Sequence, residues 1–543
     1  MSDNEQEIPQ PIRFGDIDIP VAEQIPLVLL LLSVVQQLKK ENQELRDEIQ
    51  RLKGSTTRPV IKPSVLLKPT PKPDKKLPEK RPGSAKRQKT KSLHIDQDVV
   101  LVPDDLPPGA LLEGYRDFVV QDLIFKSNNT RYRRAVYRLP DGTLRVALRP
   151  ADVSSHFGLG LHQYILLQVH QNHVTQNRLL EELRDIGIDI SAGQISHILL
   201  DGHEAFHEEK DQLLPAAREL SDHLHCDDTS ARHQGKAAVC THLGNELFAS
   251  FTTTDSKSRL NFLRLLCQPD EQYHWCEEAV EALRALGVSK KLMAVMENKR
   301  EGVWTGREAW QQHLKAWRLK PREQVRVSEA ALCGTLLMQP WYSQIGLVSD
   351  DAPQFKLFGL IHGLCWVHGE RKIDRLIPLT AAHRRTKERS QSEFWELYAS
   401  LKIYREEPTP ALRETIETGF DAMCQRQTSY VELNQALGLL HAKRDGFLAV
   451  LEHPQLPPHN NLAENDIREY ARLRNISGGT RSDTGRRCRD TFISLKKTCR
   501  KLSVSFSSYL RDRLSGAKSI PRLVDLMSAK AKQTSAAINL EPG

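Results

Sequence analysis

The sequence lacks any C-x-x-C pair, although its 543 residues include nine cysteines. Without such a pair, neither a zinc ribbon nor a thioredoxin-like redox site is indicated. An odd number of cysteines on a long chain without a secretory signal fits a reducing compartment, so we expect a cytoplasmic protein.

The chain also has little that could enter a membrane. Its apolar segment from Ile25 to Val35 has about half the length that a helix needs to span a bilayer. The acidic and polar start of the sequence does not match a signal peptide. We therefore expect no membrane partner.

Positive charge is concentrated in one segment. The net charge of +8, with 39% hydrophobic and 27% charged residues, describes a soluble globular protein of roughly three or four domains. Between Arg58 and Lys91 there are twelve basic residues and only two acidic ones, Asp74 and Glu79, which gives a local charge of +10. Residues 54–92 therefore read as a Pro/Lys-rich linker. It is either a solvated spacer or an arm that binds DNA phosphates without reading sequence.

A heptad repeat precedes the linker and predicts a coiled-coil helix over residues 25–53. One heptad position holds Val28, Val35, Asn42 and Ile49, and the position three residues later holds Leu31, Leu38, Leu45 and Leu52. β-Branched residues at the first position with Leu at the second favour two parallel strands, and the single Asn fixes their register. We expect a homodimer through this helix. The alternative is an amphipathic helix that packs on its own chain.

A small β-rich region is predicted over residues 93–150. The segments FVVQDLIF, TRYRRAVYRLP and LRVALRP have strand character, and Asp141-Gly142 supplies a turn between the last two.

A helix-turn-helix is predicted within residues 151–221. Thr175 to Ile186 form one amphipathic helix, Gly187 breaks it, and Ser191 caps a second helix. Gln194 on the second helix is a candidate DNA contact. Plain helical packing is the alternative.

Three acidic positions lie at the ends of predicted elements that are far apart in the chain. Asp227 lies in a strand followed by two more strands and a helix, which suggests the start of a ribonuclease-H-like sheet. Asp350 ends the short strand IGLVS. Glu464 falls in the first turn of a helix that Asn460 or Asn461 can cap. If the two strands are neighbours and the helix packs beside them, the three acids converge. The alternative is three unrelated surface acids.

Converging carboxylates would form a metal site of a specific kind. Hard oxygen ligands select Mg²⁺ or Mn²⁺, and two such ions can activate water or a 3′-hydroxyl and stabilise the leaving oxygen at a phosphodiester. The basic sequence around the acids supplies candidate DNA contacts: Arg371, Lys372, Arg468, Arg472 and Arg474.

The segment FKLFGLIHGLCWVHGERKIDRL after the second acid predicts a helix, and the stretch from Leu401 to Val450 predicts two long helices. His362, Cys365 and His368 fall three residues apart on the first of these helices. That spacing offers metal ligands, although packing of Trp366 with Cys365 explains the same residues.

Four ordered motifs resemble those of insertion-sequence-66-type transposases. The segment HCDDT resembles the family's H-A-D-E-T, and LVSDDAPQF resembles its second-acid segment. CWVHGERK looks like C-W-A-H-x-R-R-K, and HNNLAENDIR followed by RLRNISGG resembles D-N-N-x-x-E-x-x-I-R and R-K-N. The resemblance runs from about Asp222 to Leu510.

The resemblance implies a transposase of a bacterial, nucleoid-associated insertion-sequence system that cleaves and joins DNA ends. It gives Asp227, Asp350 and Glu464 the metal-binding, catalytic roles of a DDE transposase with two Mg²⁺ or Mn²⁺ ions per site. Asp228 and Asp351 are the neighbours that could be confused with them. DNA is then the partner, and accessory transposition proteins are left open.

The sequence departs from the family pattern at several points. No cysteine precedes Cys226, so the family's cysteine-rich zinc-binding segment is missing. Asp228 stands where the family has Glu, and His459 where it has Asp. These departures keep two alternatives open: a catalytically inactive, transposase-derived DNA-binding dimer, and a metal-dependent nuclease without strand transfer.

The predicted fold class is α/β, a ribonuclease-H-like catalytic core with large helical insertions. The expected organisation, in chain order, is a disordered tail (1–24), the coiled coil (25–53), the linker (54–92), the β-rich region (93–150), the helix-turn-helix region (151–221), the catalytic domain (222–510) with a helical insertion at about 268–342, and a C-terminal tail (511–543).

Overall fold

The computed structural model describes residues 12–14, 17–19, 95–105, 107, 110–116, 119–120, 122–150 and 155–538. The expected coiled coil and linker lie outside these residues and stay predictions. The chain divides into two units, residues 1–118 and 119–543. In the first unit, β1 (Ile12–Phe14) pairs antiparallel with β2 (Ile17–Ile19). Within the described residues, no helix combines the length and the apolar character that a membrane crossing requires.

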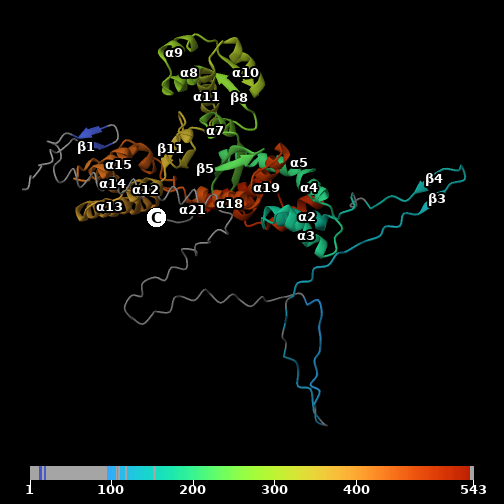
Figure 1. The fold of residues 1–543 in the computed structure, drawn as a ribbon. Helices are drawn as coiled ribbons and strands as arrows, with labels where there is room; N and C mark the ends of the chain where they lie inside the picture. The colour runs from blue at the N-terminus through green and yellow to red at the C-terminus, as the bar shows by residue number, and fades with distance from the viewer. Residues whose placement is uncertain are drawn as a thin grey trace, which may run out of the picture. The chain divides into compact units, whose positions relative to one another are not determined.

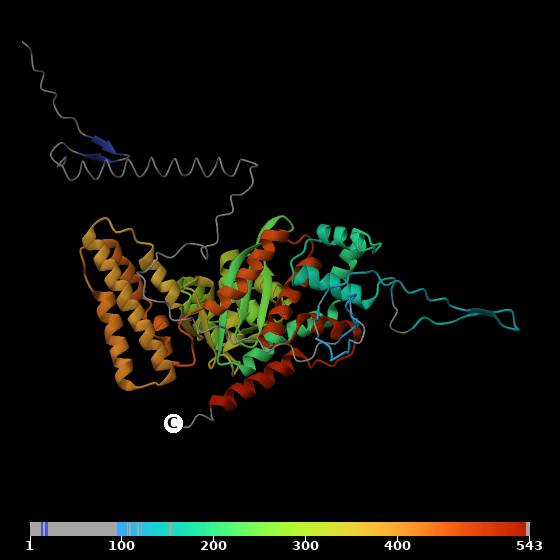
Figure 2. The same cartoon turned by 90° about the horizontal axis from the view of Figure 1, so that it is seen from below.

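A mixed five-stranded sheet forms the centre of the second unit (Figure 2). Its strands are β5 (His223–His233), β6 (Lys236–Gly244), β7 (Ala249–Thr254), β10 (Gly346–Ser349) and β11 (Ile361–Leu364). The order is β11-β10-β5-β6-β7. The first three strands form the predicted antiparallel meander, and β10 and β11 add to β5 in parallel. The mixed α/β class is therefore confirmed.

Two C-terminal helices, α18 (Asn461–Ser477) and α19 (Asp483–Lys501), pack on this sheet. Helix α19 supplies hydrogen-bond acceptors to the edge strand β7. Side chains four residues apart on the helix accept hydrogen bonds from alternate backbone N–H groups of the strand. These pairs are Thr498 with Ala249 (3.1 Å), Ser494 with Phe251 (2.9 Å) and Asp490 with Thr253 (2.7 Å). The edge is thereby closed to pairing with another strand.

The helices expected before the catalytic domain are present (Figure 1). They are α2 (Leu159–His170), α3 (Gln176–Asp185), α4 (Ala192–Leu200), α5 (Glu204–Asp211) and α6 (Leu213–Leu220). Between α3 and α4, Gly187 has φ +82°, a conformation that favours glycine, and the Ser191 hydroxyl accepts a 3.2 Å hydrogen bond from the backbone N–H of Gln194. The DNA-binding role of this pair stays a prediction.

The β-rich region is smaller than the sequence predicts. Among its described residues, β3 (Val136–Arg138) and β4 (Leu144–Val146) are the strands, and the predicted Asp141-Gly142 turn joins them. The segment FVVQDLIF forms no strand among its described residues, and its described apolar side chains are exposed. No neighbouring element in the described part of the chain buries these apolar side chains, and a strand-like sequence does not form a strand without such packing.

A mostly helical lobe lies between the meander and β10, as the sequence predicts (Figure 1). After α7 (Arg259–Leu266) it contains α8 (Glu277–Ala285), α9 (Lys290–Met296), α10 (Arg307–Ala316) and α11 (Pro321–Leu337). The sequence did not indicate its small hairpin of β8 (Gln272–Trp275) and β9 (Gly302–Thr305). The rings of Tyr273 and Trp310 stack at 4.9 Å in the core of the lobe.

A second helical region follows β11. It consists of α12 (Trp366–Asp374), α13 (Ala381–Glu406), α14 (Pro410–Gln425), α15 (Val431–His441), α16 (Arg444–Phe447) and α17 (Ala449–Glu452). Figure 2 shows the three long helices α13 to α15 side by side. Two long helices were expected for the stretch from Leu401 to Val450. Helix α13 instead begins twenty residues earlier, and the rest of the stretch divides at Pro410 and Tyr430.

The range 511–543, expected as a tail, is folded where the structure describes it. Helix α20 (Phe506–Ser515) is followed by α21 (Leu523–Ile538), which packs against α6. Leu523 and Met527 are fully buried. The buried carboxylate of Glu209 accepts a hydrogen bond from the Leu523 N–H at 2.9 Å, which ties the start of α21 to α5.

Candidate functional site

The parallel pairing of β5 and β10 brings the first two predicted acids to neighbouring positions, although Asp227 lies within β5 and only Asp350 follows the end of its strand. The last aligned pair is Val348 with His225. Asp350 and Asp227 each follow two residues later, so the same register brings them to equivalent positions. Because residues two apart along a strand share a face, Asp227 lies on the face of β5 that also carries His225.

Asn460 fixes the start of α18 against this edge. Its side-chain Nδ2 donates to the Cys226 carbonyl at 2.7 Å, and its Oδ1 accepts from His225 Nδ1 at 3.0 Å. Its backbone N–H donates to Cys365 Sγ at 3.2 Å. Asn460 does occupy the N-cap position, but its side chain makes no capping hydrogen bond, contrary to one option of the sequence analysis. The amide is already engaged with β5.

Glu464 lies one turn into α18, and its side chain is 13% exposed. Three cationic or polar groups surround it: Arg468 at 3.2 Å, Arg371 at 3.5 Å and His368 at 3.6 Å. One oxygen, Oε1, is buried and accepts no hydrogen bond. A carboxylate held in this way retains an oxygen for a further ligand.

The environment of Asp227 shows that the acids act on one another. Burial, together with the negative charges of Asp350, Asp228 and Glu464, raises the pKa of Asp227 to about 7, against the opposing effect of the hydrogen bond from the Asp228 N–H. Such mutual repulsion requires the three predicted acids to lie near each other. Among the described residues, however, the carboxylates of Asp227, Asp350 and Glu464 do not form a group of ligand atoms within 4.8 Å of one another, so their convergence on a metal stays a prediction.

Asp227 and its neighbour Asp228 have different partners. Asp228 is ion-paired with Lys257 at 2.8 Å and accepts a hydrogen bond from Gln354 at 2.6 Å. Asp227 forms no ion pair with any described residue and accepts only the N–H of Asp228, at 2.8 Å. The Asp228 carboxylate is therefore neutralised within the folded protein, whereas the Asp227 carboxylate has no cationic partner among the described residues.

The second pair divides in the same way. Asp351 is ion-paired with three lysines: Lys356 at 3.1 Å, Lys372 at 3.1 Å, and Lys443. Asp350 has no ion pair with any residue in the described part of the chain and accepts only the Ala352 N–H at 3.1 Å. The sequence did not indicate that Lys257 and this lysine cluster neutralise Asp228 and Asp351, because such ion pairs leave no recognisable motif.

The prediction that His362, Cys365 and His368 share one helix is wrong. The segment begins with strand β11, so His362 lies on that strand and hydrogen-bonds to Ser349 Oγ at 2.7 Å. Cys365 is the N-cap of α12 and His368 lies within that helix. Glu464 takes the third place instead, because ligand atoms of Cys365, His368 and Glu464 lie within 4.8 Å of one another.

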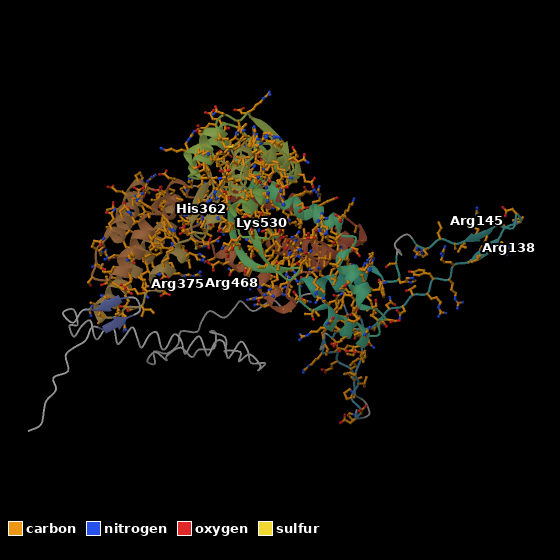
Figure 3. The ribbon with its side chains drawn as sticks, turned by 45° about the horizontal axis from the view of Figure 1, so that its top comes forward. Arg138, Arg145, His362, Arg375, Arg468 and Lys530 are labelled. Carbon is orange, nitrogen blue, oxygen red and sulfur yellow. The ribbon has the colours of Figure 1, made fainter. Side chains whose placement is uncertain are left out.

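The candidate DNA contacts fall into separate places. Arg371 and Lys372 face Glu464 and Asp351, as described above. Arg468 and Arg472 are exposed on α18, and Arg468 is labelled in Figure 3. Arg474 instead hydrogen-bonds to the backbone carbonyl and hydroxyl of Ser230.

Gln194 is exposed on α4, 33 residues before Asp227 in the sequence. Arg472 lines a cavity of about 450 Å³ together with Gln171, His173, Glu469, Asn475, Ile476 and Arg500. Further basic residues occur on the β3–β4 hairpin, where Figure 3 labels Arg138 and Arg145.

Comparison with known proteins identifies a family for the chain. The family model described as "Transposase IS66 family" matches residues 154–243 and 327–487, which include all three predicted acids. The uncovered range between the two segments overlaps the predicted helical insertion. No solved structure matches the chain.

One curated protein is similar to a large part of the chain. A protein of Sinorhizobium fredii (strain NBRC 101917 / NGR234), named "Uncharacterized protein y4jO", is 36% identical over 323 residues. The aligned region covers 59% of this chain and the whole of the relative. The chain belongs to the IS66 family of transposases.

Proposed function

We propose that the protein cleaves and joins DNA ends by metal-dependent phosphodiester transfer, with Asp227, Asp350 and Glu464 as the catalytic carboxylates. One observation carries this proposal. Asp350 follows β10 next to Asp227 on the neighbouring parallel strand, and burial together with the negative charges of Asp350, Asp228 and Glu464 raises the pKa of Asp227 to about 7. Holding such acids together without a counter-ion is unfavourable, so the arrangement fits divalent cations.

The donor set suits Mg²⁺ or Mn²⁺. All three side chains offer hard carboxylate oxygens, and Glu464 Oε1 is buried without a hydrogen-bond donor. We propose two ions, which supply Lewis-acid activation of the attacking oxygen and stabilisation of the leaving oxygen. Asn460 and the lysines around Asp351 keep the carboxylates in position. Water is the nucleophile in the cleavage, and the freed 3′-hydroxyl is the nucleophile in the joining step.

The remaining assignments belong to the same proposal. The meander that carries Asp227, extended by two parallel strands, supports a ribonuclease-H-like core. Arg371, Lys372, Arg468 and Arg472 are proposed to contact DNA phosphates, which are neutralised by Lys and Arg without sequence preference. A coiled-coil homodimer would hold two element ends together in the bacterial cytoplasm, at the nucleoid.

The test is a set of isosteric substitutions assayed for cleavage and joining of terminal DNA in Mg²⁺. We expect Asp227→Asn, Asp350→Asn and Glu464→Gln each to abolish cleavage while DNA binding is retained, because each removes a ligating charge at nearly constant shape.

Asp228→Asn is the matched control for the first acid and is expected to be milder, since that carboxylate is ion-paired with Lys257. Near-normal cleavage by any of the three variants would remove that residue from the site. Cleavage without joined products would support a nuclease, and DNA binding without cleavage by the parent protein would support an inactive dimer.

A further inference from the structure

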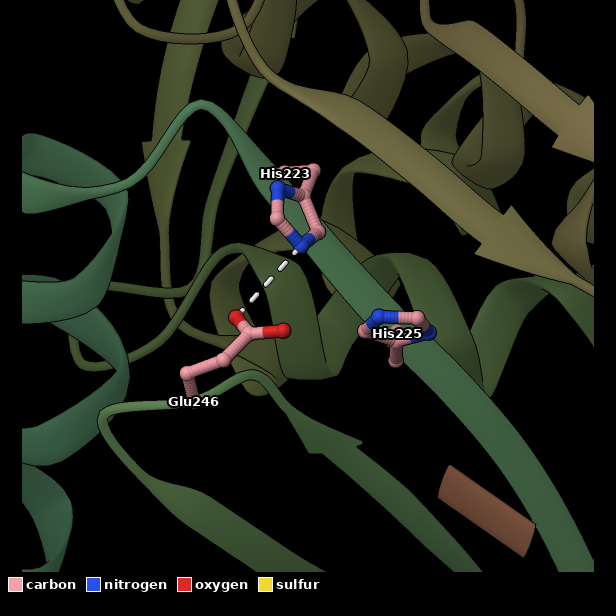
Figure 4. A group of neighbouring side chains, drawn as sticks. All are labelled: His223, His225 and Glu246. Atoms are coloured by element: carbon pink, nitrogen blue, oxygen red, sulfur yellow. Dashed lines mark ion pairs between the residues drawn. The ribbon is translucent and has the colours of Figure 1, made fainter. Parts of the chain in front are cut away.

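A second group of ligand-type side chains lies at the beginning of β5, outside the acid site. One ligand atom of each of His223, His225 and Glu246 lies within 4.8 Å of the others. Figure 4 shows the two imidazoles side by side on β5, with Glu246 reaching toward them from the turn between β6 and β7. The rings of the two histidines are 5.3 Å apart and nearly perpendicular.

Both histidines are oriented by an oxygen acceptor on Nδ1. His223 Nδ1 is 2.7 Å from Asp222 Oδ1. His225 Nδ1 is 3.0 Å from Asn460 Oδ1, and Asn460 must present its oxygen there because its Nδ2 donates to the Cys226 carbonyl. For His225 this leaves the proton on Nδ1 and the lone pair on Nε2. Metal-binding histidines have this arrangement, since an acceptor on one nitrogen fixes the tautomer that ligates through the other. The pKa of His223, lowered by burial but raised more by the carboxylates of Asp222 and Glu246, stands at about 9, so a metal would displace a proton from its Nε2.

One pair of ligand atoms, from His223 and Glu246, has the spacing expected in a metal coordination sphere. His223 Nε2 is buried, makes no hydrogen bond and lies 3.5 Å from Glu246 Oε2. Two ligands at Zn–N and Zn–O distances of about 2.0–2.2 Å in a tetrahedron are separated by about 3.4 Å. The observed separation fits this value without movement of either residue.

The third ligand is held on rigid backbone. Asn245, next to Glu246, donates through Nδ2 to Ser221 Oγ at 2.7 Å and to the His223 carbonyl at 3.3 Å. Its own carbonyl accepts from Lys501 Nζ at 2.7 Å. The turn that carries Glu246 is thus fastened to the strand that carries the histidines, so the group is preorganised.

We propose that His223, His225 and Glu246 form a zinc site. Two imidazoles and one carboxylate with an exposed side suit Zn²⁺ with a water as fourth ligand, whereas Mg²⁺ prefers an all-oxygen set. Asp222 and Asn460 orient the histidines without touching the metal. The ion would clamp the beginning of β5 to the β6–β7 turn.

The test uses the full chain carrying Asp227→Asn and Glu464→Gln, so that neither the acid site nor the Cys365–His368–Glu464 group contributes. Zinc is removed with a chelator, and Zn²⁺ binding is then measured by equilibrium dialysis and metal analysis with Mg²⁺ in excess. We expect one Zn²⁺ per chain. Bound Co²⁺ in its place is expected to show the visible absorption of a four-coordinate ion.

Glu246→Gln is the decisive variant, because its side chain is 60% exposed and its loss does not disturb the core. We expect zinc affinity to fall ten-fold or more. Glu452→Gln, whose side chain is 62% exposed, is the matched control and should bind as the parent does. Asp222→Asn, which alters only the orienting acceptor, should weaken binding by about ten- to a hundred-fold.

Absence of bound zinc in the parent, or unchanged affinity in Glu246→Gln, would overturn the proposal. His223 would then be an imidazolium that forms ion pairs with Asp222 and Glu246. Because the tested protein lacks two of the proposed catalytic acids, this outcome leaves the proposed transposase chemistry untouched.

Discussion

Replacement of Asn460 tests whether one buried amide positions the catalytic helix. The residue is 1% exposed, and its side chain hydrogen-bonds to the Cys226 carbonyl and to His225 Nδ1. Asn460→Ala removes both hydrogen bonds and leaves two buried polar groups without partners.

The expected loss of stability comes from the two buried groups that lose their hydrogen-bond partner, the Cys226 carbonyl and His225 Nδ1. An unsatisfied buried donor or acceptor costs roughly 1–3 kcal/mol, so the free energy of unfolding should fall by about 2–6 kcal/mol. In a domain of this size, about 1 kcal/mol shifts the melting temperature by about 2–4 °C. A fall of the order of 10 °C is therefore expected. Cleavage should fall as well, because Glu464 lies one turn beyond the lost anchor.

Asn461→Ala is the control, since Asn461 is the next residue but is exposed. Thermal unfolding and the rate of DNA cleavage are measured for both variants. A loss of less than about 1 kcal/mol in Asn460→Ala would refute the reasoning, since that is the smallest cost of even one unsatisfied buried group. Equal effects of the two variants would refute it too, because they would point to a general role of the loop.

Two further predictions follow from burial and close approach. In metal-free protein, the raised pKa of Asp227 means that its stabilising contribution is present below about pH 4 and is lost as pH rises toward about 7. Thermal unfolding at several pH values should therefore show Asp227→Asn gaining stability relative to the parent over that window, and a constant difference would contradict the assigned burial. Gly479→Ala should destabilise the protein by about 1–3 kcal/mol, because the added Cβ would lie 2.5 Å from the Arg232 carbonyl. Gly438→Ala, where nothing lies within 4 Å, should be neutral or stabilising in the same denaturation assay.

Elements specified by local signals were predictable from the sequence. The three strands of the meander β5–β7 were predicted in their order along the chain, and Ser191 caps α4 as its capping pattern indicates. Strand β11 was missed because a short buried parallel strand is apolar without alternation and resembles the helix that follows it. The folded C-terminus was missed because the burial of Leu523 depends on α6, about three hundred residues earlier.

The choice of acid within each Asp-Asp pair shows where sequence reasoning ends. Alternation places Asp227 and Asp228 on opposite faces of β5, but it does not say which face meets α18. In the folded protein, lysines from distant parts of the sequence form ion pairs with one acid of each pair. Lys257 neutralises Asp228, and Lys443, ninety-two residues after Asp351, joins the lysines around that carboxylate. In each pair one acid is thus ion-paired within the fold, which leaves its neighbour as the carboxylate that can bind a cation.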